Sequence, residues 1–262
     1  MAPSIVLIPG MSSLGTEVYA PLVAQLAKHS FTDTHPLDLP SIDCLSRLES
    51  LTPNPLEADI RHIRATLTQL VEKGSDVIII AHSYGGTPAL AAAEALWSHH
   101  REANTGGILK AILLSSSLSL PGGDVGRTDR AEWCKANNVS LDANAHIEMV
   151  QDQLIFYPEN MEADWFNDLP DTEAKRWAET LRPCALGALM SPVPESMVGD
   201  WRVEYLVTEG EDKAMPEGFQ RWLVERARRE GAQVNVKGMK SGHFVQISHA
   251  EEVVGWVKEV CS

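Results

Sequence analysis

Several short runs of this chain consist mostly of apolar residues, with no regular alternation of apolar and polar positions. Each run is bounded by Gly, Pro, Ser or charged residues. The four clearest runs are residues 5–8, 77–80, 109–114 and 203–207. Such runs are typical of strands buried on both faces, as in a parallel sheet covered by helices. The more polar residues 34–38 and 233–236 predict strands near the edges of the same sheet.

Between these runs, apolar positions recur at the spacing of a helix. The predicted helices are residues 18–28, 56–73, 88–97, 218–229 and 249–260. Strand and helix alternate on both sides of one interruption. This order predicts the α/β class, with a mostly parallel, doubly wound sheet of about six strands and right-handed crossovers.

The interruption, residues 119–200, contains polar helical stretches and no convincing strand. Four of the seven tryptophans lie in it or at its edge, namely Trp133, Trp165, Trp177 and Trp201. A long insertion between two core strands is typical of a cap. We therefore expect a core of residues 1–118 and 201–262 and a helical cap of residues 119–200. The alternative is a second packing layer that meets no ligand.

Composition narrows the range of partners. The chain has 262 residues, 44% of them hydrophobic and 22% charged, and a net charge of −14 at pH 7. The charge is spread along the chain, and the longest basic cluster is the short stretch 226–229. This balance argues against nucleic acid or an anionic membrane as the partner and is typical of a soluble protein. The expected partner is a small-molecule substrate.

The cysteines and the N-terminal segment bear on compartment and cofactors. Cys44, Cys134, Cys184 and Cys261 lie far apart and form no C-x-x-C pair, so we expect a reducing compartment and neither disulfides nor a bound metal. The first apolar run meets Pro9 at once, which is unlike a signal peptide or a membrane span. We expect a cytoplasmic protein without a cofactor. A homodimer is compatible with the sequence, which does not decide the oligomeric state.

The segment that follows the second apolar run points to catalysis. A serine on a sharp strand-to-helix turn needs small residues two positions before and two after it. Ala81 and Gly85 occupy these positions around Ser83, so the sequence reads A-x-S-x-G in place of the usual G-x-S-x-G. Gly86 allows the following helix to pack tightly on the sheet, and Pro88 suits its first turn. We interpret Ser83 as the nucleophile of such an elbow.

A serine nucleophile requires a base, and the base requires a carboxylate to orient it. In this architecture the chain order is Ser, acid, His. His243 lies in the loop before the last predicted helix and is the expected base, whereas His146 falls in the cap and His249 at a helix start. The acid is expected just after the fourth apolar run. Asp212 is the first choice there, with Glu211 and Glu209 as competitors.

The oxyanion of an acyl-transfer intermediate needs two backbone N–H donors. One is expected from Tyr84, directly after the nucleophile, and the other from Met11 in the loop after the first strand. Gly10 lets this loop approach the site closely.

Aromatic residues of the cap and residues beside the triad are expected to contact the substrate. These residues are Gly10, His82, Phe156, Trp165, Trp177 and Phe244. The cap aromatics indicate an apolar or aromatic acyl or alcohol group, and the alternative is that they only pack the cap on itself.

On these residues the chain resembles the α/β-hydrolase superfamily over nearly its whole length. The matching segments are residues 7–10, 36–40, 81–86, 211–216 and 242–244, with residues 165–168, 177 and 181–183 of the cap. It is most similar to the compact members, among them plant methylesterases, hydroxynitrile lyases and microbial relatives. The resemblance implies that Ser83, Asp212 and His243 form the family triad and that Met11 and Tyr84 are its oxyanion donors.

Two positions separate this chain from the lyases of that group. Hydroxynitrile lyases of this kind typically carry Thr in the first loop and Lys directly after the catalytic His. Here these positions hold Gly10 and Phe244, and the first agrees with the esterases. The His-Gly that is common in the first loop is replaced by Pro9–Gly10.

The leading hypothesis is a serine hydrolase that cleaves a small to medium carboxylic ester, lactone or thioester through an acyl-enzyme on Ser83. A second hypothesis keeps the site but changes the reaction to carbon–carbon cleavage or cyclisation in secondary metabolism, since fold and triad do not fix the substrate. A third is a ligand-binding receptor relative, against which the complete triad argues.

Overall fold

The computed structural model describes residues 2–46, 52–102, 105–124, 126, 128–139 and 146–261. Its strands are β1 Ser4–Ile8, β2 Thr34–Pro36, β3 Asp76–His82, β4 Gly107–Leu114, β5 His146–Val150, β6 Gln153–Tyr157, β7 Cys184–Ala185, β8 Arg202–Thr208 and β9 Gln233–Met239. Its α-helices are α1 Gly15–Val18, α2 Ala20–Lys28, α3 Pro55–Glu72, α4 Gly86–Ala92, α5 Thr128–Asn137, α6 Glu162–Trp165, α7 Asp171–Ala178, α8 Gly187–Met190, α9 Glu217–Arg229, α10 Val245–Ser248 and α11 Ala250–Cys261. Its 3₁₀ turns include η2 Ser83–Gly85, η3 Ser98–His100 and η4 Val198–Asp200.

The main sheet has six strands in the order β2-β1-β3-β4-β8-β9, and all neighbouring pairs are parallel. The four apolar runs of the sequence form its four central strands, and the two more polar stretches form its edges, as predicted. The prediction of a doubly wound α/β sheet of six strands is therefore confirmed.

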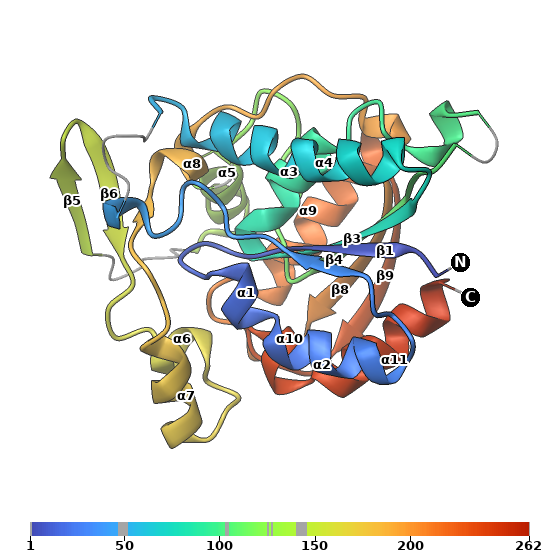
Figure 1. The fold of residues 1–262 in the computed structure, drawn as a ribbon. Coiled ribbons are helices and arrows are strands. Elements are labelled where there is room, and N and C mark those ends of the chain that lie inside the picture. The colour runs from blue at the N-terminus through green and yellow to red at the C-terminus, as the bar shows by residue number, and fades with distance from the viewer. Residues whose placement is uncertain are drawn as a thin grey trace.

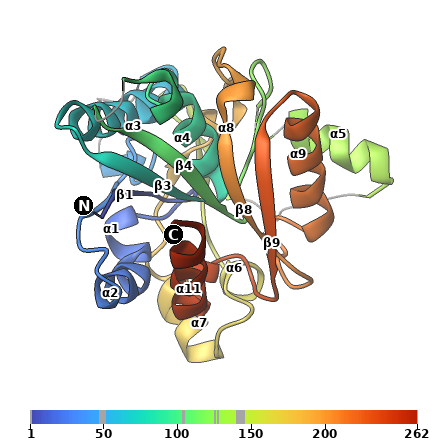
Figure 2. The ribbon, with the colours of Figure 1, turned by 90° about the vertical axis from the view of Figure 1, so that its right-hand side faces the viewer.

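Helices cover both faces of this sheet (Figures 1 and 2). Along β1, Ile5 and Leu7 belong to the hydrophobic cluster that includes residues of α2 and α11, whereas Val6 and Ile8 belong to the cluster that includes α3, α4 and α9. Alternate side chains of one strand thus point into two different cores. This is the physical reason why the strand sequence is apolar without interruption.

The predicted helix 88–97 is shorter in the structure, because α4 ends at Ala92. Ala95 adopts a positive φ of 63°, which is incompatible with a right-handed helix. Five residues beyond the helix, Trp97 is 1% exposed and pairs with Ile108 of β4 in an isolated bridge. Burial of this indole on the sheet overrides the helix propensity of the alanine-rich stretch.

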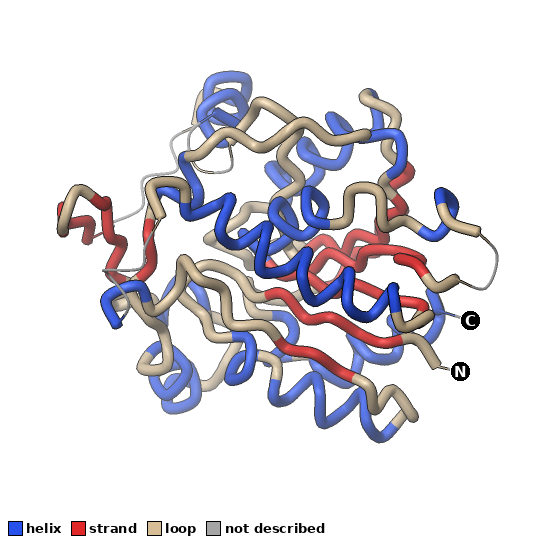
Figure 3. Tube along the Cα trace, turned by 45° about the horizontal axis from the view of Figure 1, so that its top comes forward, coloured by secondary structure: helices blue, strands red, loops and turns tan. Residues whose placement is uncertain are grey.

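The stretch 119–200 differs from the prediction in one respect. Besides α5–α8 and η4, it contains a three-stranded sheet, β5-β6-β7, so the expectation that it has no strand is wrong. The strand β5 pairs antiparallel with β6, and the two project from one end of the molecule (Figures 1 and 3). Most residues of β5 are exposed, so this strand lacks the apolar run by which the core strands are identified.

The carboxyl ends of the parallel strands lie at the same edge of the sheet, and the segments that follow β3, β8 and β9 therefore converge there. No helix within the described ranges is long and apolar enough to cross a membrane.

The two-sided burial of the central strands generates the first prediction. Ile79 of β3 is 0% exposed. Replacing it by Ala removes buried methyl groups and leaves a cavity, so we expect Ile79→Ala to lower the free energy of unfolding by about 2–5 kcal/mol. Urea unfolding followed by circular dichroism measures the change. Val236→Ala on edge strand β9, where the side chain is 38% exposed, is the control and should cost less than about 1 kcal/mol. Equal losses for the two variants would contradict this account of the core.

Candidate active site

Ser83 occupies a tight turn between β3 and α4. Its φ is +50°, in the left-handed region that a residue with a side chain adopts only under constraint. The constraint comes from the segment that follows β4, because the Ser117 N–H and the Ser116 hydroxyl donate to the Ser83 carbonyl oxygen at 2.8 and 2.7 Å. The turn thereby raises the Ser83 side chain above the carboxyl edge of the sheet.

The turn has no room for larger residues. A Cβ on Gly85 would lie 2.5 Å from the carbonyl oxygen of Pro9 and 2.8 Å from that of Ile8. A Cβ on Gly86 would lie 2.4 Å from the Ser117 carbonyl oxygen. Small residues are needed after the serine, as inferred from the sequence, because the turn packs closely against the ends of the neighbouring strands.

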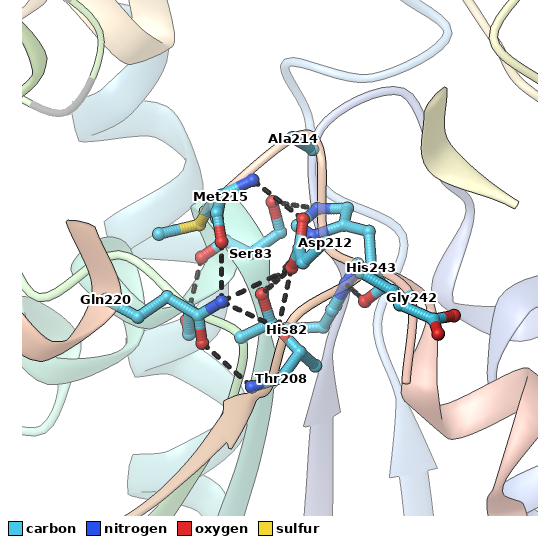
Figure 4. Close-up of polar contacts among 12 residues, drawn as sticks. His82, Ser83, Thr208, Asp212, Ala214, Met215, Gln220, Gly242 and His243 are labelled. Carbon is cyan, nitrogen blue, oxygen red and sulfur yellow. Dashed lines mark hydrogen bonds and ion pairs between the residues drawn. The ribbon is translucent and has the colours of Figure 1, made fainter. Parts of the chain in front are cut away.

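Three side chains from distant segments meet at this turn. His243 Nε2 lies 2.9 Å from Ser83 Oγ, and His243 Nδ1 lies 2.9 Å from Asp212 Oδ2 (Figure 4). With Nδ1–H donating to the carboxylate, Nε2 is left to accept the serine proton. His243 and Asp212 are 3% and 6% exposed, so this chain of hydrogen bonds is shielded from water.

The competing acids and histidines lie elsewhere. Glu211 pairs with Lys240 at 3.7 Å and Glu209 with Arg221 at 2.8 Å. His146 pairs with Glu148 in the hairpin, and His249 Nδ1 lies 3.8 Å from Asp168. Of the alternatives considered, His243 is the histidine that contacts Ser83, and Asp212 is the acid that contacts His243.

The Asp212 carboxylate is held by several donors. Its Oδ1 accepts from the Met215 N–H at 2.7 Å, and its Oδ2 accepts from the Thr208 hydroxyl at 2.8 Å and from the Ser115 hydroxyl. Burial by itself raises the pKa of Asp212, but the charge of His243 and these hydrogen bonds outweigh burial, so the pKa lies below its usual range. The carboxylate is therefore ionised at neutral pH.

Sequence reasoning missed the residues that support Asp212. Ser115 directly follows β4 and Thr208 ends β8, and a polar residue where a buried parallel strand ends was a usable signal. Gln220 of α9 is fully buried, and its amide nitrogen donates to Thr208 Oγ1 at 2.6 Å and to the Met215 carbonyl (Figure 4). A glutamine in line with Leu223 and Val224 on an apolar helix face was the only sequence sign of this role.

The first loop lies against the nucleophile, as expected. A Cβ on Gly10 would lie 2.8 Å from Ser83 Cβ and 2.8 Å from His82 Nδ1. This contact brings the backbone that leads into Met11 next to Ser83. The Tyr84 ring, in contrast, is buried, and its hydroxyl donates to Asp59 Oδ2 at 2.7 Å. Burial raises the pKa of Tyr84, which keeps the hydroxyl protonated for this bond.

His82 lies directly behind the triad. Its Nε2 donates to the His243 carbonyl oxygen at 2.9 Å, and its ring centroid is 4.6 Å from that of His243. Burial, followed by the charge of His243, holds the pKa of His82 well below its usual range, so the ring is neutral. Its Nδ1 is buried and has no hydrogen-bond partner in the described part of the chain. His82 is fully buried and thus supports both the backbone and the ring of His243 from behind.

The four aromatic residues expected to meet a substrate differ in how close they lie to His243. Trp165 lies with its ring centroid 6.4 Å from that of His243, and Phe156 of β6 stacks on Trp165 at 6.1 Å. Phe244 is 2% exposed and stacks on Phe166 at 4.4 Å, and both Phe244 and Trp177 belong to the cluster on the α2 and α11 side. The Phe244 ring nevertheless meets that of His243 edge-on, with centroids 5.5 Å apart. The structure therefore places Trp165 and Phe244 beside His243, with Phe156 stacked on Trp165, and places Trp177 in the core.

Two polar residues between α6 and α7 contact both loops that carry the triad. Asn167 Nδ2 donates to the Glu211 carbonyl oxygen at 3.0 Å, next to Asp212. Asp168 Oδ2 accepts from the Gly242 N–H at 2.7 Å and from the Ser248 hydroxyl at 2.7 Å. Segment 119–200 is thus joined by hydrogen bonds to the backbone on either side of the triad. Sequence reasoning assigned these two residues no role.

Comparisons with known proteins bear on the family and the fold of this chain. The sequence profile of the "Alpha/beta hydrolase family" matches residues 5–256. No curated protein matches the chain significantly by sequence.

Among solved structures, polyneuridine aldehyde esterase superposes with a TM-score of 0.77 at 17% identity, covering 100% of both chains. A pyrethroid hydrolase from Sphingobium faniae JZ-2 gives a TM-score of 0.70 at 18% identity, covering 100% of this chain and 98% of that one. Tomato methylketone synthase I gives 0.71 at 16% identity, covering 99% and 98%. At these identities the likeness is one of fold.

The crowding around the serine turn gives a prediction. Because an added methyl group at residue 85 would collide with two backbone oxygens, we expect Gly85→Ala to displace the turn and to lower kcat on an activated ester by about 100-fold. The matched control is Gly255→Ala in α11, where nothing lies within 4 Å of the added Cβ. This control should keep its activity and gain up to about 1 kcal/mol in stability. Full activity of Gly85→Ala would show that the turn tolerates a side chain.

The contacts of Asp168 give a second prediction. Removing its carboxylate frees the Gly242 N–H and loosens the loop that presents His243, so we expect Asp168→Ala to lower kcat by about 10-fold or more with a smaller change in KM. Asp168→Asn keeps one acceptor oxygen and should lose less. The control is Asp164→Ala, an exposed aspartate of the same insertion that pairs with Lys213 at 3.6 Å. Steady-state kinetics with one ester measures all three, and a loss in KM alone would contradict a positioning role.

Proposed function

The chain belongs to the α/β-hydrolase family, and on that premise we propose that it is a serine hydrolase that cleaves a carboxylic ester through an acyl-enzyme on Ser83. The observation that carries the proposal is the unbroken hydrogen-bond chain from Ser83 Oγ through His243 to Asp212, with 2.9 Å at each link. A strained serine at the carboxyl edge of a parallel sheet, bonded to a histidine that is itself bonded to a buried carboxylate, is the arrangement that activates a hydroxyl for attack on a carbonyl.

In the proposed reaction, Ser83 Oγ attacks the carbonyl carbon of the ester while His243 Nε2 takes the serine proton. The tetrahedral intermediate collapses, and the imidazolium returns its proton to the departing alcohol. A water molecule then repeats the sequence on the acyl-enzyme, with His243 as its base, and releases the acid and free Ser83.

Asp212 stabilises the imidazolium that forms in each step. Because its carboxylate is ionised and already bonded to Nδ1–H, no group has to move when the charge appears on His243. The donors from Ser115, Thr208 and Met215 fix the carboxylate itself. We assign the oxyanion to the backbone N–H groups of Tyr84 and Met11, and the close approach of Gly10 to Ser83 supports the choice of Met11.

We further propose that residues 119–200 act as the cap of the site. Trp165 and Phe156, which lie toward His243, suit an apolar group on the acyl or alcohol side of a small to medium ester. Two structural neighbours, polyneuridine aldehyde esterase and a pyrethroid hydrolase, have names that agree with ester chemistry on small molecules.

A second candidate is a non-hydrolytic reaction at the same site. It is favoured by the neighbour named methylketone synthase, whose name describes synthesis and not ester cleavage. In such a reaction Ser83 and His243 would move protons without an acyl adduct. Intact mass measurement during turnover separates the two, since only the hydrolase adds the acyl mass to the chain.

The proposed mechanism gives a direct prediction. A fluorophosphonate probe should label the wild-type chain on Ser83 and should label neither Ser83→Ala nor His243→Ala. In each variant, kcat on the best substrate of an ester and lactone panel should fall by about 10⁴-fold or more, because the triad acts as a unit. Ser46→Ala, at an exposed serine outside the site, should label and turn over normally. Labelling of Ser83→Ala, or its normal turnover, would rule out Ser83 as the nucleophile.

A further inference from the structure

Outside the triad, one cluster of side chains has the composition of a metal site. Among the described residues, only His99, His100 and Asp200 bring three potential ligand atoms from His, Cys, Asp or Glu within 4.8 Å of one another. The cluster joins two segments that are about a hundred positions apart in the sequence. It was not recognised in the sequence because nothing in their spacing links them.

The fold places these segments together through two adjacent strands. Turn η3 precedes β4 and turn η4 precedes β8, and β4 and β8 are parallel neighbours. The two turns therefore meet at the amino edge of the sheet. Figure 2 shows β4 and β8 side by side. The triad lies at the opposite, carboxyl edge, so this cluster is separate from the catalytic residues.

Both turns are anchored by buried indoles. Trp97 immediately precedes η3, and Trp201 immediately follows Asp200, and each is 1% exposed. The bridge from Trp97 to Ile108 fixes η3 on β4. The Met197 N–H also donates to Glu94 Oε2 at 3.1 Å, which ties the start of η4 to the chain before η3. The backbone that carries the three side chains is thus held by the core.

The donor atoms have a spacing that suits one ion. His100 Nε2 lies 2.7 Å from Asp200 Oδ2, and His99 Nε2 lies 3.4 Å from Asp200 Oδ1. Ligand atoms at about 2.0–2.1 Å from a tetrahedral zinc ion are roughly 3.3 Å apart. The two imidazole rings lie with centroids 4.3 Å apart, and both present Nε2 to the same carboxylate. Small side-chain rotations would therefore bring the three atoms onto one ion.

The donor set selects the class of ion. Two imidazole nitrogens and one carboxylate oxygen suit zinc, nickel, cobalt and copper, whereas calcium and magnesium prefer oxygen alone. The side chains of His99, His100 and Asp200 are 30%, 45% and 21% exposed, so water can complete the coordination.

We propose that His99, His100 and Asp200 form a binding site for a divalent transition-metal ion, which crosslinks the turns leading into β4 and β8. The ion would fasten the end of the inserted segment 119–200 to the core strand beside it. Its role is structural, since the site and the triad lie at opposite edges of the sheet.

The test uses the whole purified chain with its affinity tag removed and its metals stripped by a chelator. Isothermal titration with ZnCl₂, and with CoCl₂ read by visible absorption, should show one equivalent bound and a rise in Tm on saturation. His100→Ala and Asp200→Asn should each weaken Zn²⁺ binding by about 10-fold or more, since even residues that only support ligands contribute on the order of that factor. Circular dichroism verifies that both variants fold.

The matched control is His146→Ala. His146 also sits between carboxylates, with Nε2 2.9 Å from Glu148 and Nδ1 3.2 Å from Glu159. Because the two contacts use opposite ring nitrogens, this histidine cannot chelate an ion together with both, and the variant should bind Zn²⁺ as the wild type does. The proposal is overturned if Zn²⁺ fails to bind, or if it binds equally well to His100→Ala and Asp200→Asn, which would leave the cluster as His–Asp ion pairs only.

Discussion

The site depends on the conformation of one residue, Ser83, whose left-handed backbone lies where β3 turns into α4. A strand that ran straight into a helix would bury its last side chain in the sheet. The turn instead lifts the hydroxyl to the carboxyl edge, where the loops after β8 and β9 arrive. The backbone strain at Ser83 is tolerated because Gly85 and Gly86 allow the ends of β1 and β4 to pack closely against the turn. The close packing at the edge of the sheet and the position of the candidate nucleophile therefore depend on the same turn.

The second constraint is the buried carboxylate of Asp212. Removing a charge from water costs several kcal/mol unless donors replace the lost hydration. Here a backbone N–H, two hydroxyls and the His243 ring supply them, and Gln220 of α9 bonds to two of the residues involved, Thr208 and Met215. A helix that otherwise packs on the sheet through apolar side chains thus also fixes the geometry of the triad.

The inserted segment joins this arrangement through polar contacts as well as aromatic ones. Asn167 and Asp168 bond to the backbone beside Asp212 and His243, so the loops of the triad lie between the sheet and the insertion. At the other edge of the sheet, the same segment ends at Asp200 next to His99 and His100. The insertion is therefore attached to the core at both edges of the sheet.

The sequence by itself determined the six strands of the main sheet, the longer helices that cover it, and Ser83 and His243 as two of the three side chains that meet. Apolar runs without alternation identify strands buried on both faces, and the order Ser, acid, His follows from the architecture that they predict. It left the choice among Asp212, Glu211 and Glu209 open, since all three follow the same strand.

Only the tertiary structure decided which residues support these three. Ser115, Gln220 and Asp168 reach the triad from segments far apart in the chain. A polar residue at the end of β4 and a glutamine on an apolar helix face are visible in the sequence, but nothing there shows that they meet Asp212. The hairpin β5–β6 and the early end of α4 also escaped prediction. The exposed hairpin lacks a buried face to impose a pattern, and α4 ends because Trp97 gains more by packing on β4 than the alanines gain as helix. The pattern of apolar residues in a segment indicates which of its side chains are buried. Contacts between distant polar groups, in contrast, form only when the sheet brings their segments together.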